Sequence, residues 1–252
     1  CSIYFLLVNI ISGVMGFSVT KELNGNKKER RELPEIELKE YTNKYICLIA
    51  FIICLGILLF GSKIITKFWM LIVFYVVILS LMIGVFYKQL IHDFKIFKSY
   101  FKEYFVLILK TWGKALVLIM ITTIIIQIIT HTTQANNQIA LQNLFNSNPV
   151  FIAILAMFCA PIVEELMFRG VFRKFIKNKK LFVIVSGVVF GLMHVIDDSK
   201  TLAEFSYVFV YSILGIYLAG IYAKTNNLCT NIVMHFMQNT LSVIGMILLM
   251  FM

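Results

Sequence analysis

Long apolar runs separated by short polar segments dominate the hydrophobic pattern of this 252-residue chain. Most runs approach the ~20 residues that an α-helix needs to cross a bilayer. Because such runs are too long for ordinary strands, the pattern predicts an all-α fold, a polytopic transmembrane helical bundle. We predict eight spans, at Ile3 to Val19, Tyr45 to Gly61, Phe68 to Tyr87, Ala115 to Ile129, Val150 to Gly170, Leu181 to Val195, Ser206 to Ala223 and Asn231 to Met252.

The charged residues indicate how these spans are oriented. Only 14% of residues are charged, against ~25% in soluble proteins, and the net charge is +10. Nineteen of the 23 lysines and arginines lie in the loops after the first, third, fifth and seventh spans. The positive-inside rule therefore predicts that these loops are cytoplasmic and that both termini of a multi-pass cell-membrane protein lie outside. This distribution argues for the lipid bilayer as partner, and against nucleic acid.

Two connectors and a division of the chain follow from the same pattern. Apolar residues and lysines alternate at helical spacing from Lys88 to Phe105, which predicts a basic amphipathic helix lying on the cytoplasmic leaflet. The outer connector from Thr130 to Pro149 is uncharged and predicts a short loop helix. We divide the chain into residues 1–114, with the first spans, the charged cytoplasmic loop and the interfacial helix, and residues 115–252, a membrane core.

The fifth predicted span carries three ionisable residues in the segment APIVEELMFRGVF. Charges at bilayer depth are costly, by roughly 2.5 kcal/mol or more each, and usually serve a function. On a helix Glu165 and Arg169 are four residues apart and can pair, whereas Glu164 points about 100° away. Glu164 is then free to act as a general base. The alternative is that both glutamates pair with Arg169 and only hold helices together.

Two later spans add histidines at a similar depth. The segment FGLMH places Phe190 and His194 one helical turn apart, and the last span carries Asn231, His235 and Asn239 on one face. Counted from the nearest cytoplasmic basic residues, the carboxylate and the two imidazoles lie about 15, 21 and 16 Å deep at 1.5 Å per residue. The sequence therefore predicts that they meet in one layer of the membrane.

Such a cluster has two chemical interpretations, and both lead to amide hydrolysis. Glu164, His194 and His235 can hold one Zn²⁺ with a bound water. Alternatively, Glu164 and His194 activate a water without a metal, while His235 and Asn239 donate hydrogen bonds to the developing oxyanion. The local HExxH pattern of zinc proteases is absent from the sequence.

Three segments, in this order, resemble motifs of a known family: EELMFR fits EExxxR, FGLMH fits FxxxH and HFMQN fits HxxxN. The chain resembles the CPBP family of intramembrane proteases, which includes CAAX prenyl endopeptidases of the Rce1 type, bacteriocin-processing and self-immunity proteins and abortive infection proteins. The resemblance covers about residues 150–239. It implies a water-activating Glu164 assisted by His194, an oxyanion site from His235 and Asn239, and a geometry supported by Glu165, Arg169 and Phe190.

The resemblance also bears on cofactor, substrate and alternative functions. Both metal-dependent and metal-free sites have been described for the family, so the cofactor is either none or one Zn²⁺. The implied substrate is a peptide or a membrane-associated protein, and abundant Ile, Lys and Asn suggest a Gram-positive bacterial source. The alternative is a non-catalytic bacteriocin-immunity or partner-binding membrane protein, which would depend on outer loops such as Gln134 to Asn148. A transporter would distribute its polar residues along a path, whereas here they share one layer.

Overall fold

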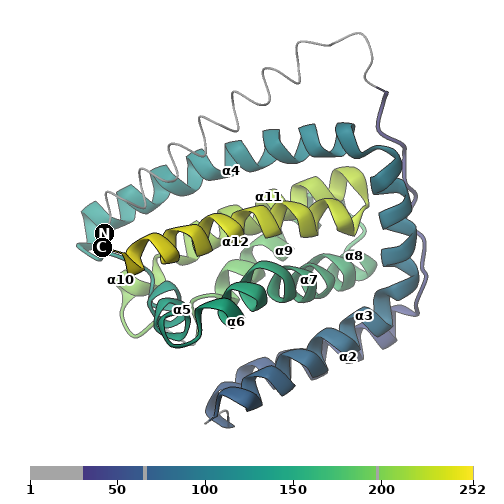
Figure 1. Cartoon of the computed structure of the whole chain (residues 1–252). Coiled ribbons are helices and arrows are strands. Elements are labelled where there is room, and N and C mark those ends of the chain that lie inside the picture. Colours follow the sequence, from purple (N-terminus) through teal and green to yellow (C-terminus); the bar gives the residue numbers. More distant parts are fainter. Residues whose placement is uncertain (1–30, 65–66, 197–198, 252) are drawn as a thin grey trace.

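The computed structural model describes residues 31–64, 67–196 and 199–251, which are helical with short connections and contain no strand. In Figure 1, α8 and the turn between α3 and α4 lie at one end of the bundle. The other end carries α5, α10 and the last residues of α12. The elements are α2 (Lys44–Ile64), α3 (Phe68–Ser99), α4 (Phe101–Thr130), α5 (Asn136–Ser147), α6 (Pro149–Ile154), η2 (Leu155–Cys159), α7 (Ala160–Glu165), η3 (Leu166–Val171), α8 (Phe172–Phe175), α9 (Lys179–Met193), α10 (Leu202–Phe205), α11 (Val208–Thr225) and α12 (Leu228–Met250).

Six helical segments of the described ranges are long and apolar enough to cross a membrane, so the protein is a multi-pass membrane protein. The first of the eight predicted spans, Ile3 to Val19, lies outside the described residues. The sixth prediction, Leu181 to Val195, corresponds to α9, which has 15 residues. At 1.5 Å per residue α9 is about 22 Å long, less than the ~30 Å hydrocarbon core. It ends early because the chain turns at His194.

The separate interfacial helix predicted from Lys88 to Phe105 is not present. These residues instead form the end of α3 and the start of α4, which meet at Tyr100. One face of this part of α3 packs on protein, because Asp93 is 1% exposed and accepts a hydrogen bond of 2.9 Å from the Leu228 backbone, whereas Lys88, Lys95 and Lys98 are exposed. In Figure 1 this part of α3 turns across one end of the bundle toward α4.

Two further predictions concern the connectors and the division of the chain. The short loop helix predicted between Thr130 and Pro149 is confirmed as α5. The boundary between residues 114 and 115 falls inside α4, and the division into two parts stays a prediction. The end of the bundle that faces the cytoplasm likewise stays a prediction.

The closest helix contact in the core joins α9 to α11. Cβ atoms built on Gly187 and Gly191 would lie 2.7 Å from the backbone nitrogens of Ile216 and Ser212. This confirms that the GxxxG spacing brings another backbone close. From the α11 side, a Cβ on Gly215 would lie 2.5 Å from the Gly187 carbonyl oxygen.

We expect Gly215→Ala to lower the free energy of unfolding by about 1–3 kcal/mol, because the added methyl group forces α9 and α11 apart. Gly220→Ala is the matched control on the same helix, since its Cβ meets nothing within 4 Å. Alanine there is expected to leave stability unchanged or to raise it by up to about 1 kcal/mol. Denaturation of the two purified variants in detergent checks this, and equal stabilities would contradict the close-contact explanation.

Candidate active site

The carboxylate pair sits at the end of a short α-helix between two π-helical segments. Glu164 and Glu165 close α7, with η2 before it and η3 after it. Isolated π-helical turns inside α-helices occur often at functional sites. The side chain of Glu165 is fully buried, whereas that of Glu164 is 23% exposed. The two neighbouring carboxylates therefore have different surroundings, as the helical geometry predicts.

Glu165 lies at the centre of a buried hydrogen-bond network. Its Oε1 accepts from Nη1 of Arg169 at 3.1 Å and from Nδ1 of His235 at 2.8 Å, and its Oε2 accepts from Nδ2 of Asn231 at 3.2 Å. Arg169 also donates from Nη2 to the Gly215 carbonyl at 2.9 Å. The network joins α7 and η3 to α11 and α12. Because both oxygens of Glu165 are occupied, this residue serves the arrangement of the helices.

The two imidazoles present the same ring nitrogen to Glu164. Nδ1 of His194 is 2.8 Å from the Phe190 carbonyl oxygen, and Nδ1 of His235 faces the ion-paired carboxylate of Glu165. Both partners accept hydrogen bonds, so each Nδ1 carries a proton and each Nε2 of the neutral ring keeps a lone pair. These Nε2 atoms lie 3.7 and 3.8 Å from Oε2 of Glu164.

The predicted convergence of Glu164, His194 and His235 is thus present. Oε2 of Glu164 is buried and has no hydrogen-bond partner within the described part of the chain. Buried polar atoms of this kind are uncommon in folded proteins and call for an explanation. The side chain of His194 is 20% exposed and that of His235 is 2% exposed, so the cluster is more accessible on the His194 side.

Phe190 supports both imidazoles from one position. Its ring centroid lies 4.4 Å from that of His194 and 5.7 Å from that of His235. The guanidinium carbon of Arg169 lies 4.8 Å from the same centroid, in the range of a cation–π contact. The phenyl ring is fully buried, so it fixes the orientation of three side chains at once.

Asn239 lies one helical turn beyond His235, and its amide contacts the backbone. Nδ2 donates to the Ala156 carbonyl of η2 at 2.8 Å. One of its two N–H groups therefore holds the π-helical segment that precedes α7, and the other remains for a ligand. Ser186 makes a similar bond on the other side of the pair, from Oγ to the Phe168 carbonyl of η3 at 2.9 Å. The sequence contains no signal for either bond.

A further neighbour of the site, Tyr211, is missed by motif reasoning. Its ring stacks on His194 with centroids 4.8 Å apart and planes at 23°. Tyr211 is the fourth residue of α11 and lies in an apolar run with no recognisable motif. Only the fold reveals that it covers the catalytic candidate His194.

Comparisons with known proteins match the part of the chain that carries the candidate site. Residues 146–241 match the family described as "Type II CAAX prenyl endopeptidase Rce1-like". This match supports the resemblance of the region to the CPBP family. All CPBP motif residues named above, from Glu164 to Asn239, fall inside the matched segment. The match to this family model supports membrane protease activity in general.

Two curated relatives share part of the chain. The "Putative membrane peptidase YdiL" of Bacillus subtilis is 28% identical over 114 residues, which cover 44% of this chain and 43% of YdiL. The "UPF0177 protein YvdC" of Lactococcus lactis is 28% identical over 122 residues, which cover 48% of this chain and 44% of YvdC. The match thus spans less than half the length of each relative. No solved structure matches.

Proposed function

We propose that this protein is an intramembrane endopeptidase that hydrolyses a peptide bond of a peptide or membrane-associated protein. The observation that carries this proposal is the convergence of two imidazole Nε2 atoms on the unpartnered Oε2 of Glu164. A carboxylate with a free oxygen beside two imidazoles is suited to deprotonating a water at membrane depth. The general membrane-protease assignment of the family agrees with this chemistry.

Glu164 is the general base in this mechanism. A water that donates to Oε2 of Glu164 loses a proton to it as its oxygen bonds to the substrate carbonyl carbon. His194 orients this water by accepting its second hydrogen at Nε2, the atom that the Phe190 carbonyl leaves free. When the carbon–nitrogen bond breaks, the proton held by Glu164 passes to the leaving amine. Base and acid are then the same carboxyl group at two stages.

The oxyanion is stabilised from α12. His235 donates from Nε2 only when it carries a second proton, because its Nδ1 proton is already bound to Glu165. In that form Nδ1 makes a charge-assisted hydrogen bond to the Glu165 carboxylate at 2.8 Å. Asn239 contributes the N–H group that the Ala156 carbonyl does not use. Each such donor typically contributes a factor of ~10² to 10³ to kcat.

The donors also fit zinc in kind, because Glu164, His194 and His235 offer one oxygen and two imidazole nitrogens with free lone pairs. An ion held by these three residues would polarise the substrate carbonyl and lower the pKa of a bound water. The separations of 3.7 and 3.8 Å exceed the about 3.3 Å between neighbouring ligands of tetrahedral zinc. In the described ranges no three His, Cys, Asp or Glu side chains are arranged to hold a metal ion.

A hydrolysis assay in isotopically labelled water tests the proposal. The purified protein, reconstituted in lipid nanodiscs, is incubated in H₂¹⁸O with peptides derived from bacterial membrane proteins. We expect cleavage with one ¹⁸O atom in each new carboxyl group, at a rate that a zinc chelator leaves unchanged. If a chelator abolishes cleavage and Zn²⁺ restores it, the metal-free mechanism is wrong and the zinc-dependent one takes its place. Binding of peptides without any cleavage would contradict peptidase function and leave the immunity or partner-binding alternative.

A further inference from the structure

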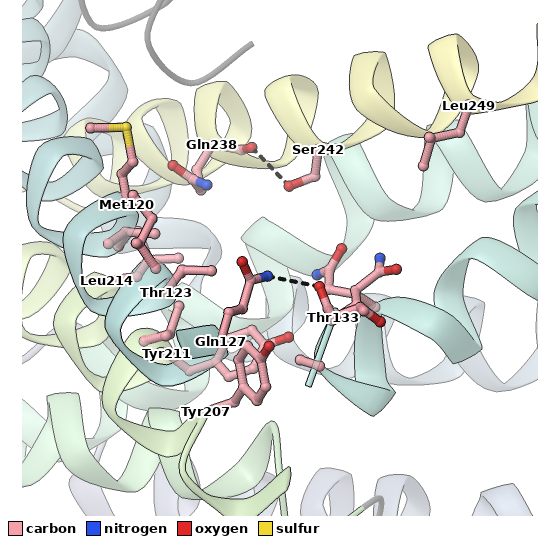
Figure 2. Close-up of a pocket in the computed structure, with 16 residues that line it drawn as sticks. Met120, Thr123, Gln127, Thr133, Tyr207, Tyr211, Leu214, Gln238, Ser242 and Leu249 are labelled. Carbon is pink, nitrogen blue, oxygen red and sulfur yellow. Dashed lines mark hydrogen bonds between the residues drawn. The ribbon is translucent and has the colours of Figure 1, made fainter. Parts of the chain in front are cut away.

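A cavity of about 150 Å³ lies between α4, α11 and α12, and it is bounded at one end by the connector before α5. In Figure 2, Thr123 and Gln127 of α4, Tyr211 of α11 and Gln238 of α12 surround the same space. It lies toward the end of the bundle that carries α5 and α10, opposite the turn between α3 and α4 (Figure 1). None of the roles assigned above involves this cavity.

The cavity adjoins the candidate catalytic cluster through Tyr211. This residue lines the cavity, and its ring stacks on His194 at 4.8 Å. His194 in turn places Nε2 3.7 Å from Oε2 of Glu164. On α12 the lining residue Gln238 directly precedes Asn239. The Tyr211 ring therefore contacts both the cavity and the catalytic cluster, and α12 carries residues of both sites.

The residues that line the cavity are all uncharged. None of its sixteen lining residues is Asp, Glu, Lys, Arg or His. A charged side chain placed there would lose its hydration without gaining an ionic partner, which is strongly unfavourable. More than half of the lining residues nevertheless carry a hydroxyl or amide group. The exposed surface of the walls is still mostly apolar, which suits an apolar side chain. The polar groups suit the N–H and C=O groups of the peptide that carries this side chain, whereas a lipid acyl chain needs no such partners.

The hydrogen bonds already present leave donors for such a peptide. Oε1 of Gln238 accepts from Nε1 of Trp112 at 3.0 Å, so its amide nitrogen is the group left for a ligand. Gln127 donates from Nε2 to the Thr133 carbonyl at 2.7 Å, which leaves its Oε1 as an acceptor. The volume of the cavity, about 150 Å³, equals that of an apolar cavity known to bind benzene. One large apolar side chain, such as that of Leu, Met or Phe, matches this size.

We propose that this cavity is the pocket for one uncharged, apolar side chain of the substrate peptide, next to the bond that is cleaved. The proposal rests on the peptidase function proposed above and adds its specificity. Tyr211 is the wall shared by this pocket and the catalytic cluster. A substrate with Asp, Glu, Lys or Arg at that position is rejected because the pocket offers no counter-charge.

A thiol-protection experiment tests the pocket without relying on catalysis. Thr123→Cys introduces a thiol into the wall, and Ile121→Cys places one on the same helix at a site that is 45% exposed and outside the cavity. Both variants, in nanodiscs, react with a small methanethiosulfonate reagent in the presence of capped alanine hexapeptides with Leu or Asp at one central position. The wild-type protein supplies the background from its own cysteines.

We expect the Leu peptide to slow labelling of Thr123→Cys at least about 10-fold, the Asp peptide to have no effect, and Ile121→Cys to respond to neither. Equal labelling of Thr123→Cys with both peptides overturns the pocket. In a second arm, Thr123→Phe fills the cavity and Ile121→Phe is its control. Cleavage of the Leu peptide is expected to show about a 10-fold higher KM in Thr123→Phe alone, with the all-Ala peptide unaffected.

The two arms separate failure of the pocket from failure of the enzyme. If the Leu peptide protects Thr123→Cys but no peptide is cleaved, the proposed pocket stands and the proposed peptidase function is wrong. If Thr123→Phe leaves cleavage of the Leu peptide unchanged and the peptide gives no protection, the proposed pocket is wrong and the peptidase function stands.

Discussion

Replacing Glu164 by glutamine is expected to lower kcat for peptide cleavage by a factor of about 10² to 10⁴, the usual contribution of a positioned general base. The amide keeps the size of the side chain but cannot accept the proton of the attacking water. KM should change little, because Oε2 of Glu164 makes no hydrogen bond to the protein and its replacement therefore leaves the shape of the site intact. The protein is expected to insert, purify and unfold like the wild type.

Glu103→Gln is the matched control for this substitution. Glu103 lies in the first turn of α4, is partly buried and takes no part in the cluster, so its neutralisation should leave kcat unchanged. Single-turnover cleavage of the same peptide by both variants and by the wild type supplies the comparison. Full activity of Glu164→Gln would sink the proposed mechanism, whatever the result for His194→Ala or His235→Ala.

Local helical geometry explains why much of the site is predictable from sequence. The pairing of Glu165 with Arg169 follows from their four-residue spacing, and it is present at 3.1 Å. The meeting of Glu164 with His194 and His235 follows from similar depths on three helices, a constraint that the membrane imposes on any bundle. The six spans of the described residues follow from the length and hydrophobicity of the apolar runs.

Other features depend on contacts that no local pattern contains. The lysine-rich end of α3 has the periodicity of a lipid-facing helix, but Asp93 on it binds the backbone of Leu228, 135 residues away. The bond from Asn239 to Ala156 depends on the π-helical segment η2. The stacking of Tyr211 on His194 depends on the close α9–α11 contact. Each of these is a property of the packed bundle.

Arg169→Met is expected to be the most destabilising single change in the site. It removes the bonds to Glu165 and to the Gly215 carbonyl, and it leaves the fully buried carboxylate with only Asn231 and His235 as partners. Breaking a buried ion pair from one side typically costs about 3–5 kcal/mol. Unfolding of the detergent-solubilised variant, followed by circular dichroism, measures this loss.

The double variant Glu165→Gln with Arg169→Met distinguishes an uncompensated charge from lost packing. With no charge left to bury, it should recover at least about half of the stability lost in Arg169→Met, because replacing both members of a buried pair is often nearly neutral. Activity should not return with stability, since His235 would lose its charge-assisted hydrogen bond of 2.8 Å to the Glu165 carboxylate, which orients the imidazole. Recovery of both would mean that the Glu165 network only holds the helices together. Wild-type stability of Arg169→Met with activity lost would instead place Arg169 among the groups that contact substrate.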